Sequence, residues 1–385
     1  MRRNLLLSAA LLLFSLGPVG WAADAIKVGG IAELTGDMPA VGASFKNAAE
    51  MAVKEVNDAG GLPVGKSKVK VQLVVEDNAG KADQSAAAAQ KLITQDEVVA
   101  IIGPNASRYA IPASEVAESS ETILITPWST NPKTTLDANT NQPKKYVFRA
   151  AFIDPFQGQV LARFAHDNLK AKSAAVLYDV ASDYNKGIAE VFKASFEKLD
   201  GKVVAFETYT TNDKDFSAQL TKIKDAKPDV IFLPNYYSEV PLQVQQAKRL
   251  GIMVPFLGSD SWGSAELLKL AGNDMEGYYF STHYAADNAT PVAKKFIESY
   301  QKTYGAVPDD VAALTYDSFG MLFSAIKNAG KTDREAVREA LSKLPKYDGV
   351  TGEMKFQPGS GDPIKSAVIL QVKGDKFVYH TNANP

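Results

Sequence analysis

Short apolar runs alternate with amphipathic stretches along most of this chain, and that rhythm limits its possible folds more than any other feature. Ile26–Ala32, Val69–Glu76, Val98–Ile102 and Thr122–Thr126 have the composition of buried strands. Between the first two, Ala43–Ala59 carries apolar residues at helical spacing. Strands that alternate with helices pack as a parallel sheet covered by helices on both faces. The sequence therefore predicts an α/β fold.

The same rhythm restarts after Phe148 and continues to about Leu257, so the 385 residues predict two Rossmann-like lobes with parallel sheets flanked by helices. Three helices without a clear strand between them follow, and short strands end the chain. This order implies a three-strand hinge with crossings near Phe148–Ala150, Phe280–His283 and Val350–Met354. We expect one lobe from residues 24–148 plus 283–351 and the other from 149–282 plus 352–385.

The first 22 residues have the pattern of a cleaved signal peptide. Arg2 and Arg3 precede the apolar run Leu5–Leu16, and Ala22 supplies a small residue for cleavage. The alternative is a membrane anchor, although the run is short for a membrane span. The chain has no cysteine, which excludes disulfides, thiol catalysis and a lipid-anchoring cysteine. We expect the mature protein in the bacterial periplasm.

Composition and motifs favour a binding protein over an enzyme. The net charge is −2 with no basic block, which gives no support for nucleic-acid binding. The three histidines lie far apart without metal-ligand spacing, and no phosphate-binding glycine loop or nucleophile elbow is present. We therefore expect no metal, no cofactor and no catalytic residue. An enzyme built from scattered residues remains an alternative.

Two predicted strands of the first lobe end in small polar loops. One loop, at Gly103–Asn105, opens a helix at Ser107, and the other runs from Pro127 to Thr130. Free backbone N–H groups, hydroxyls and a helix N-terminus suit an anion such as a carboxylate. Ser107 has an alternative role as a helix cap, and Thr130 as an ordinary loop residue. Trp128 is large for such a loop and would shape a pocket or pack on a neighbour.

The predicted strand ends of the second lobe add an acid and several aromatic residues. Asp260 could bind a cation or cap a helix, and Tyr184 and Tyr236 follow two other strands. Tyr316 lies in an Ala-rich helix, where core packing is the alternative. Hydroxyls and N–H groups in one lobe, with a carboxylate and aromatic rings in the other, describe a site for a zwitterionic amino acid.

Long segments of the chain resemble periplasmic solute-binding proteins of ABC transporters, of the leucine/isoleucine/valine-binding type. The resemblance covers almost the whole mature chain and is strongest in IKVGGIAELTGDMPAVGASFKNAAEMAVKEVNDAGG, IIGPNASRYAIPASEVAESSETILITPWSTNP and DKDFSAQLTKIKDAKPDVIFLPNYYSEVPLQVQQAKRLGI. It implies a type I periplasmic binding protein that captures a free amino acid, most simply an aliphatic or branched-chain one, by hinge closure. A membrane permease would be its partner, and the protein would be a monomer.

The resemblance also implies roles for individual residues. Ser107 and Thr130 match hydroxyl ligands of the α-carboxylate and amine, and the backbone at Trp128 matches a source of main-chain bonds. Asp260 matches the acid that receives the α-ammonium. Aromatic residues that line the cleft are matched by Tyr184, Tyr236 and Tyr316.

Two departures from the family pattern leave the ligand side chain open. Trp128 stands where relatives that bind branched-chain amino acids often have a small residue, and Val41 stands near a position that is often aromatic. The family's disulfide is also absent. The alternatives are a binding protein for an aromatic acid, amide or urea-like solute, and a ligand-sensing receptor module.

Overall fold

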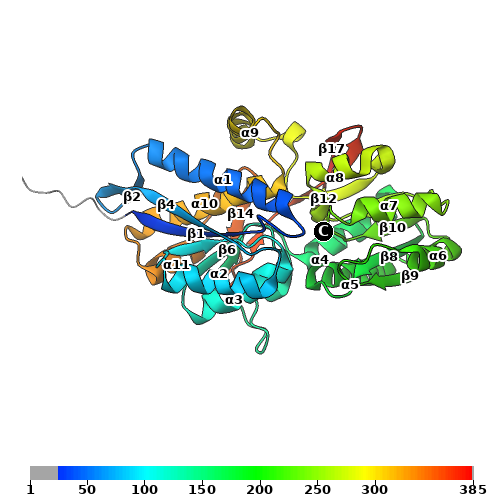
Figure 1. Cartoon of the computed structure of the whole chain (residues 1–385), viewed down its shortest axis with the longest axis horizontal. Coiled ribbons are helices and arrows are strands. Elements are labelled where there is room, and N and C mark those ends of the chain that lie inside the picture. The colour runs from blue at the N-terminus through cyan, green and yellow to red at the C-terminus, as the bar shows by residue number, and fades with distance from the viewer. Residues whose placement is uncertain (1–24, 384–385) are drawn as a thin grey trace, which may run out of the picture.

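The computed structural model describes residues 25–383 and consists of two α/β lobes side by side (Figure 1). The expected signal peptide, residues 1–22, lies outside the described residues. The expectation of two lobes with parallel sheets flanked by helices is confirmed.

The first lobe contains a five-stranded, all-parallel sheet. Its strands, in spatial order, are β4 (Val71–Asp77), β1 (Ile26–Ala32), β5 (Ala100–Ile102), β6 (Ile123–Thr126) and β7 (Val147–Arg149). The helices of this lobe are α1 (Pro39–Asp58), α2 (Ala82–Thr94), α3 (Ser107–Ser119), α9 (Pro291–Tyr304), α10 (Asp310–Ala329) and α11 (Arg334–Ser342). A hairpin of β2 (Leu62–Val64) and β3 (Ser67–Val69) follows α1.

The second lobe contains a seven-stranded sheet. Five of its strands are parallel, and the two strands nearest the C-terminus join the sheet by antiparallel pairing. In spatial order the strands are β17 (Lys376–Ala383), β16 (Ala367–Lys373), β12 (Tyr279–Thr282), β11 (Phe256–Gly258), β10 (Val230–Leu233), β8 (Ser173–Asp179) and β9 (Lys202–Tyr209). Its helices are α4 (Asp154–Arg163), α5 (Asp183–Lys198), α6 (Ser217–Ala226), α7 (Val240–Arg249) and α8 (Ala265–Ala271).

The central strands carry apolar side chains on both faces, and helices cover each face of both sheets. In β5, Ile101 packs with α2 and α3, whereas the adjacent Ile102 points to the opposite face and joins the core of α1 and α10. In the second lobe, Phe232 packs with α4 and α5, and Leu233 packs on the side of α6 and α7. Runs such as these are apolar at every position because helices cover each face.

The strand order of each sheet indicates at which point a ligand would bind. In each lobe the second strand of the parallel series lies outside the first, and the third, fourth and fifth follow on the other side. Ligands of such sheets bind at the carboxyl ends of the strands, where the order reverses. In the first lobe the reversal lies between β1 and β5, and in the second lobe between β8 and β10.

The chain passes between the lobes after β7, after β12 and before β16, and the third passage differs from expectation. The strand Gly352–Phe356 (β14) does not join the second sheet but forms a small antiparallel sheet with β13 (Tyr347–Gly349) and β15 (Pro363–Ile364). Phe356 packs on Phe148 of the first lobe. The chain enters the second sheet only at β16. Our assignment of exact lobe boundaries stays a prediction.

Within residues 25–383, no helix is long and apolar enough to cross a membrane.

Candidate ligand-binding site

The carboxyl-end loops of the two sheets face each other and enclose a small cavity. Its lining residues are Ala106, Ser107, Trp128, Thr130, Tyr184, Tyr236 and Asp260. Six of the seven site residues predicted from the sequence are therefore together in one cavity. The empty space is about 160 Å³ when all gaps between the lining atoms are counted. This is below the usual volume of sites for drug-sized ligands, so a ligand held here is small.

The loop between β5 and α3 is held in place by a buried carboxylate that the sequence did not reveal as a site residue. Glu33, directly after β1, accepts hydrogen bonds from Asn105 N (3.0 Å), Asn105 Nδ2 (2.7 Å) and Ala106 N (3.2 Å). Burial raises the pKa of Glu33 above its ordinary value. The amide groups of Asn105 and Ala106 are thus already used inside the protein, which corrects our expectation that they are available to a ligand.

The hydroxyl of Ser107 is arranged to donate a hydrogen bond into the cavity. Ser107 is the first residue of α3, and its Oγ accepts from Ser129 Oγ (2.9 Å) and Asn131 N (3.3 Å). With those acceptor positions occupied, its own proton is available to a ligand oxygen. Nearby, Thr130 Oγ1 is buried and has no hydrogen-bond partner among residues 25–383. These two hydroxyls and the first amides of α3 form one wall that suits a carboxylate.

Asp260 forms the opposite wall and is oriented by two neighbours from different elements. Its Oδ1 accepts a hydrogen bond from the Tyr184 hydroxyl (2.6 Å), and its Oδ2 lies 3.1 Å from His283 Nε2. Burial lowers the pKa of His283 below its ordinary value, so the neutral ring donates from Nε2. Phe152 stacks on that ring at 3.8 Å. The carboxylate of Asp260 is therefore buried, fixed in direction and open to a cation from the cavity.

Two more buried carboxyl groups lie near Asp260. Burial, with the added effect of the Asp260 charge, raises the pKa of Asp154 to about 8 and raises that of Asp310 well above its ordinary value. Asp154 begins α4, and its backbone N–H donates to Thr130 O (2.9 Å). Burial thus favours the neutral form of both carboxyl groups, and Asp260 is the acidic residue that lines the cavity and can meet a positive group.

Aromatic rings from both lobes cover the cavity. The Trp128 ring lies 6.1 Å from that of Tyr236, which lies 5.3 Å from that of Tyr184. The guanidinium of Arg108 lies over Tyr236, 4.8 Å from the ring centroid, and pairs with Asp37 at 2.6 Å. Arg108 follows Ser107 in the chain and connects the first lobe to Tyr236, a cavity residue of the second lobe.

Tyr316 is the one predicted site residue that the structure does not bring to the cavity. It lies on α10, its hydroxyl donates to Glu55 of α1 (2.5 Å), and its ring packs on Phe296 of α9 (4.7 Å). Both neighbours belong to the outer helices of the first lobe. Core packing against α1 and α9, the alternative considered for this residue, describes its environment, and we do not retain it in the site.

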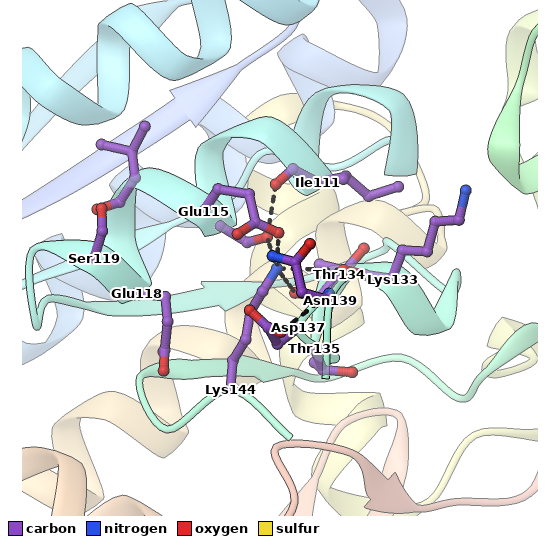
Figure 2. A network of polar contacts seen from close by, with 12 residues as sticks. Ile111, Glu115, Glu118, Ser119, Lys133, Thr134, Thr135, Asp137, Asn139 and Lys144 are labelled. Carbon is purple, nitrogen blue, oxygen red and sulfur yellow. Dashed lines mark hydrogen bonds and ion pairs between the residues drawn. The ribbon is translucent and has the colours of Figure 1, made fainter. Parts of the chain in front are cut away.

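Buried cations hold the segment that follows Thr130. The Arg149 guanidinium donates to Ser129 O (2.6 Å), Asn131 O (2.9 Å), Thr135 Oγ1 (2.6 Å) and Asp362 Oδ1 (2.6 Å). Figure 2 shows a second anchor, Lys144, between α3 and the segment 131–145. Its ammonium pairs with Glu115 (2.6 Å) and donates to Ser114 Oγ (2.9 Å) and to the carbonyls of Lys133 and Thr134 (3.3 Å each).

Sequence reasoning missed Glu33, Arg108, Asp154, His283 and Asp310. A partial signal existed for some of them. Glu33 directly follows a predicted strand, His283 lies in a predicted passage between the lobes, and Arg108 adjoins Ser107. In the described part of the chain, no group of three or more His, Cys, Asp or Glu side chains is arranged to hold a metal ion.

Comparison with known proteins agrees with this architecture. Residues 25–376 match the family model described as periplasmic binding protein. A leucine-, isoleucine-, valine-, threonine- and alanine-binding protein of Pseudomonas aeruginosa is 30% identical over 91% of this chain and 90% of its own length. The crystal structure of the leucine-binding protein LivK from Thermotoga maritima is 36% identical with a TM-score of 0.87, covering 94% of this chain and 99% of that chain.

A further similar structure was solved with a bound ligand. The branched-chain amino acid transporter substrate-binding protein LivJ from Streptococcus pneumoniae, in complex with isoleucine, is 30% identical with a TM-score of 0.85 and covers 94% of this chain and 100% of that chain. On the extent of these matches and the shared fold, the chain belongs to the periplasmic binding protein family.

Proposed function

We propose that this protein captures a free aliphatic α-amino acid between its lobes and delivers it to the membrane permease of an ABC importer. The observation that carries the proposal is the pairing of opposite walls across one cavity. Ser107 and Thr130 present hydroxyls to a carboxylate, and Asp260 presents a fixed carboxylate to an ammonium. Relatives named for binding leucine, isoleucine, valine, threonine and alanine support this ligand class.

The energetics of such a small ligand require both charged ends to be bound. Sub-micromolar affinity needs about −8 kcal/mol. The best small ligands reach about −1.5 kcal/mol per non-hydrogen atom, so an aliphatic amino acid can supply this only if its contacts are efficient. Binding without a chemical step agrees with the site, whose polar groups are arranged to hold charges at the ends of a zwitterion.

Asp260→Ala tests the ammonium assignment. Leaving a buried ammonium unpaired costs about 3–5 kcal/mol, which is roughly a hundred- to several-thousand-fold in affinity. Calorimetric titration with an amino acid that wild type binds would measure this loss. Asp225→Ala, which removes an exposed carboxylate from α6 of the same lobe, is the matched control and should bind like wild type. Equal affinities of Asp260→Ala and wild type would refute the assignment.

An aromatic acid is the main rival ligand, because Trp128, Tyr184 and Tyr236 surround the cavity. Asp260 argues against it, since a ligand with only negative charge would be repelled by this buried carboxylate. A titration series that includes benzoate decides between the two. Saturable binding of benzoate without binding of any amino acid would replace our proposal with the rival.

The transport role and the location follow from the proposed signal peptide and the family. We expect export to the periplasm, cleavage after Ala22 and action as a monomer. Deleting the gene should abolish high-affinity uptake of the amino acid that the purified protein binds. Unchanged uptake, together with tight binding in vitro, would assign the protein to sensing instead.

A further inference from the structure

Trp128 forms a wall of the cavity in a fixed orientation. Its side chain is buried, and its ring packs against Tyr236 from the other lobe. The indole Nε1–H donates to Asp310 Oδ2 at 3.1 Å. A ring that lies next to an aromatic neighbour and donates a hydrogen bond from its edge cannot swing aside without losing both contacts.

Asp310 is held by hydrogen bonds of its own, so it can act as an anchor for the indole. It is the first residue of α10, and its Oδ1 accepts from Val311 N (2.9 Å), while its Oδ2 also accepts from Thr282 Oγ1 (3.1 Å). A Cβ added at Gly263 would lie only 2.7 Å from Asp310 Oδ1, so the backbone of the second lobe closes the remaining side. The carboxyl group therefore joins Trp128 of the first lobe to the end of β12.

The space left by this wall is small. The empty volume is about 160 Å³ when all gaps between the lining atoms are counted. Because a water molecule takes about 30 Å³ of liquid volume, the cavity has room for roughly five water-sized groups. Alanine, with six non-hydrogen atoms, and serine, with seven, come close to this number, whereas leucine has nine.

We propose that Trp128, positioned by Asp310, restricts the ligand to amino acids with small side chains, of which alanine and serine fit best and leucine and phenylalanine are excluded. This inference rests on the proposed function, since it concerns the side chain of the same amino acid. Trp128 sets the size limit by occupying space, and Asp310 is a positioning residue that acts only through the indole.

Titration calorimetry of the mature protein, freed of bound ligand, with alanine, threonine, leucine and phenylalanine tests the proposal. An extra methylene that a pocket cannot accept lowers affinity by roughly tenfold or more, so wild type should bind alanine at least about tenfold more tightly than leucine. Trp128→Ala should lower the preference for alanine over leucine by about tenfold. The substitution removes the wall but keeps Ser107, Thr130 and Asp260.

Variants of Asp310 test the positioning role separately. Asp310→Ala should shift the leucine-to-alanine ratio in the same direction as Trp128→Ala. Asp310→Asn should keep the wild-type ratio of leucine to alanine affinity. Burial already favours the neutral carboxyl, and an amide oxygen can accept the same indole N–H. Trp262→Phe is the control, since this fully buried indole bonds to Leu233 O and does not line the cavity, and it should leave the ratio unchanged.

Each outcome has one meaning. If wild type binds leucine as tightly as alanine, the size limit is wrong while amino-acid capture stands. If no amino acid binds to wild type, the proposed function itself fails. If Trp128→Ala relaxes the ratio but Asp310→Ala does not, the positioning role of Asp310 is refuted. Should Asp310→Ala fail to fold, Trp128→Phe, which keeps a ring but loses the N–H donor, replaces it and should relax the ratio.

Discussion

Asp154 is a buried carboxyl group at the first residue of α4, beside Thr130 of the cavity wall. Burial and the neighbouring Asp260 raise its pKa to about 8 in the folded protein. In the unfolded chain an aspartate has a pKa of about 3.9. Between these two values the folded state holds a proton that the unfolded state has lost, so the free energy of unfolding must fall as pH rises through this window.

Asp154→Asn should remove this pH dependence. Relative to wild type, its free energy of unfolding should increase between pH 5 and pH 8 by up to about 1.4 kcal/mol per pH unit, and the difference should level off above pH 8. Urea denaturation of both proteins across this range measures the difference. A difference that does not vary with pH would show that Asp154 is already ionised in the folded protein.

At the scale of elements, the site depends on how the loop after β6 is fixed to β7. That loop carries Trp128 and Thr130, and the Arg149 guanidinium from β7 donates to the carbonyls of Ser129 and Asn131 on either side of Thr130. The same guanidinium pairs with Asp362, between β14 and β16. The buried guanidinium of Arg149 therefore connects this loop to two of the three passages between the lobes, the one after β7 and the one before β16.

Arg149→Met should destabilise the protein and weaken ligand binding together. Removing one partner of a buried ion pair costs about 3–5 kcal/mol, because Asp362 and two carbonyls lose their donor. Arg149→Lys should rescue little, since an ammonium cannot reproduce the planar fork. Arg163→Met, an exposed arginine on α4, is the control. Thermal unfolding and calorimetry measure both effects, and a wild-type Tm for Arg149→Met would contradict this role.

The sequence allowed the elements to be predicted better than the contacts between them. Most strands of the parallel series could be located from their apolar runs, whereas β7 and β12 were expected only as passages between the lobes. Ser107 and Asp260 could be placed because they lie in loops that follow such runs. Asp310 could not, because it reaches Trp128 from 182 residues away in the chain, and no local pattern encodes that contact. Tyr316 was wrongly placed because α10 is apolar over much of its surface, and only its packing on α1 and α9 decides which face meets the cavity.

At the scale of the whole molecule, direct contacts join the lobes beside the cavity. Asn131 Nδ2 donates to Asp183 O (2.9 Å), Lys133 pairs with Asp183 (2.6 Å), and Arg108 lies over the Tyr236 ring. The exposed Lys133–Asp183 pair contributes little by itself. If the proposed ligand contacts both walls at once, we expect it to supply most of the free energy of closure.

Small-angle X-ray scattering should show this closure. A saturating concentration of the amino acid should lower the radius of gyration of wild type toward the value for this structure, in which the lobes are in contact. Asp260→Ala should show no change at the same ligand concentration, because the ligand then lacks its contact with the second lobe. An unchanged radius of gyration for wild type at saturation would mean that the lobes are already closed without ligand.

The central claim is that the two walls recognise the two charged ends of one zwitterion. Calorimetric titration of wild type with alanine and with propionate, which has the same carboxylate and carbon chain but no ammonium, tests it most directly. We predict one-to-one binding of alanine and affinity for propionate lower by at least about a hundredfold, because Asp260 would then face no cation. Propionate binding as tight as that of alanine would contradict the claim.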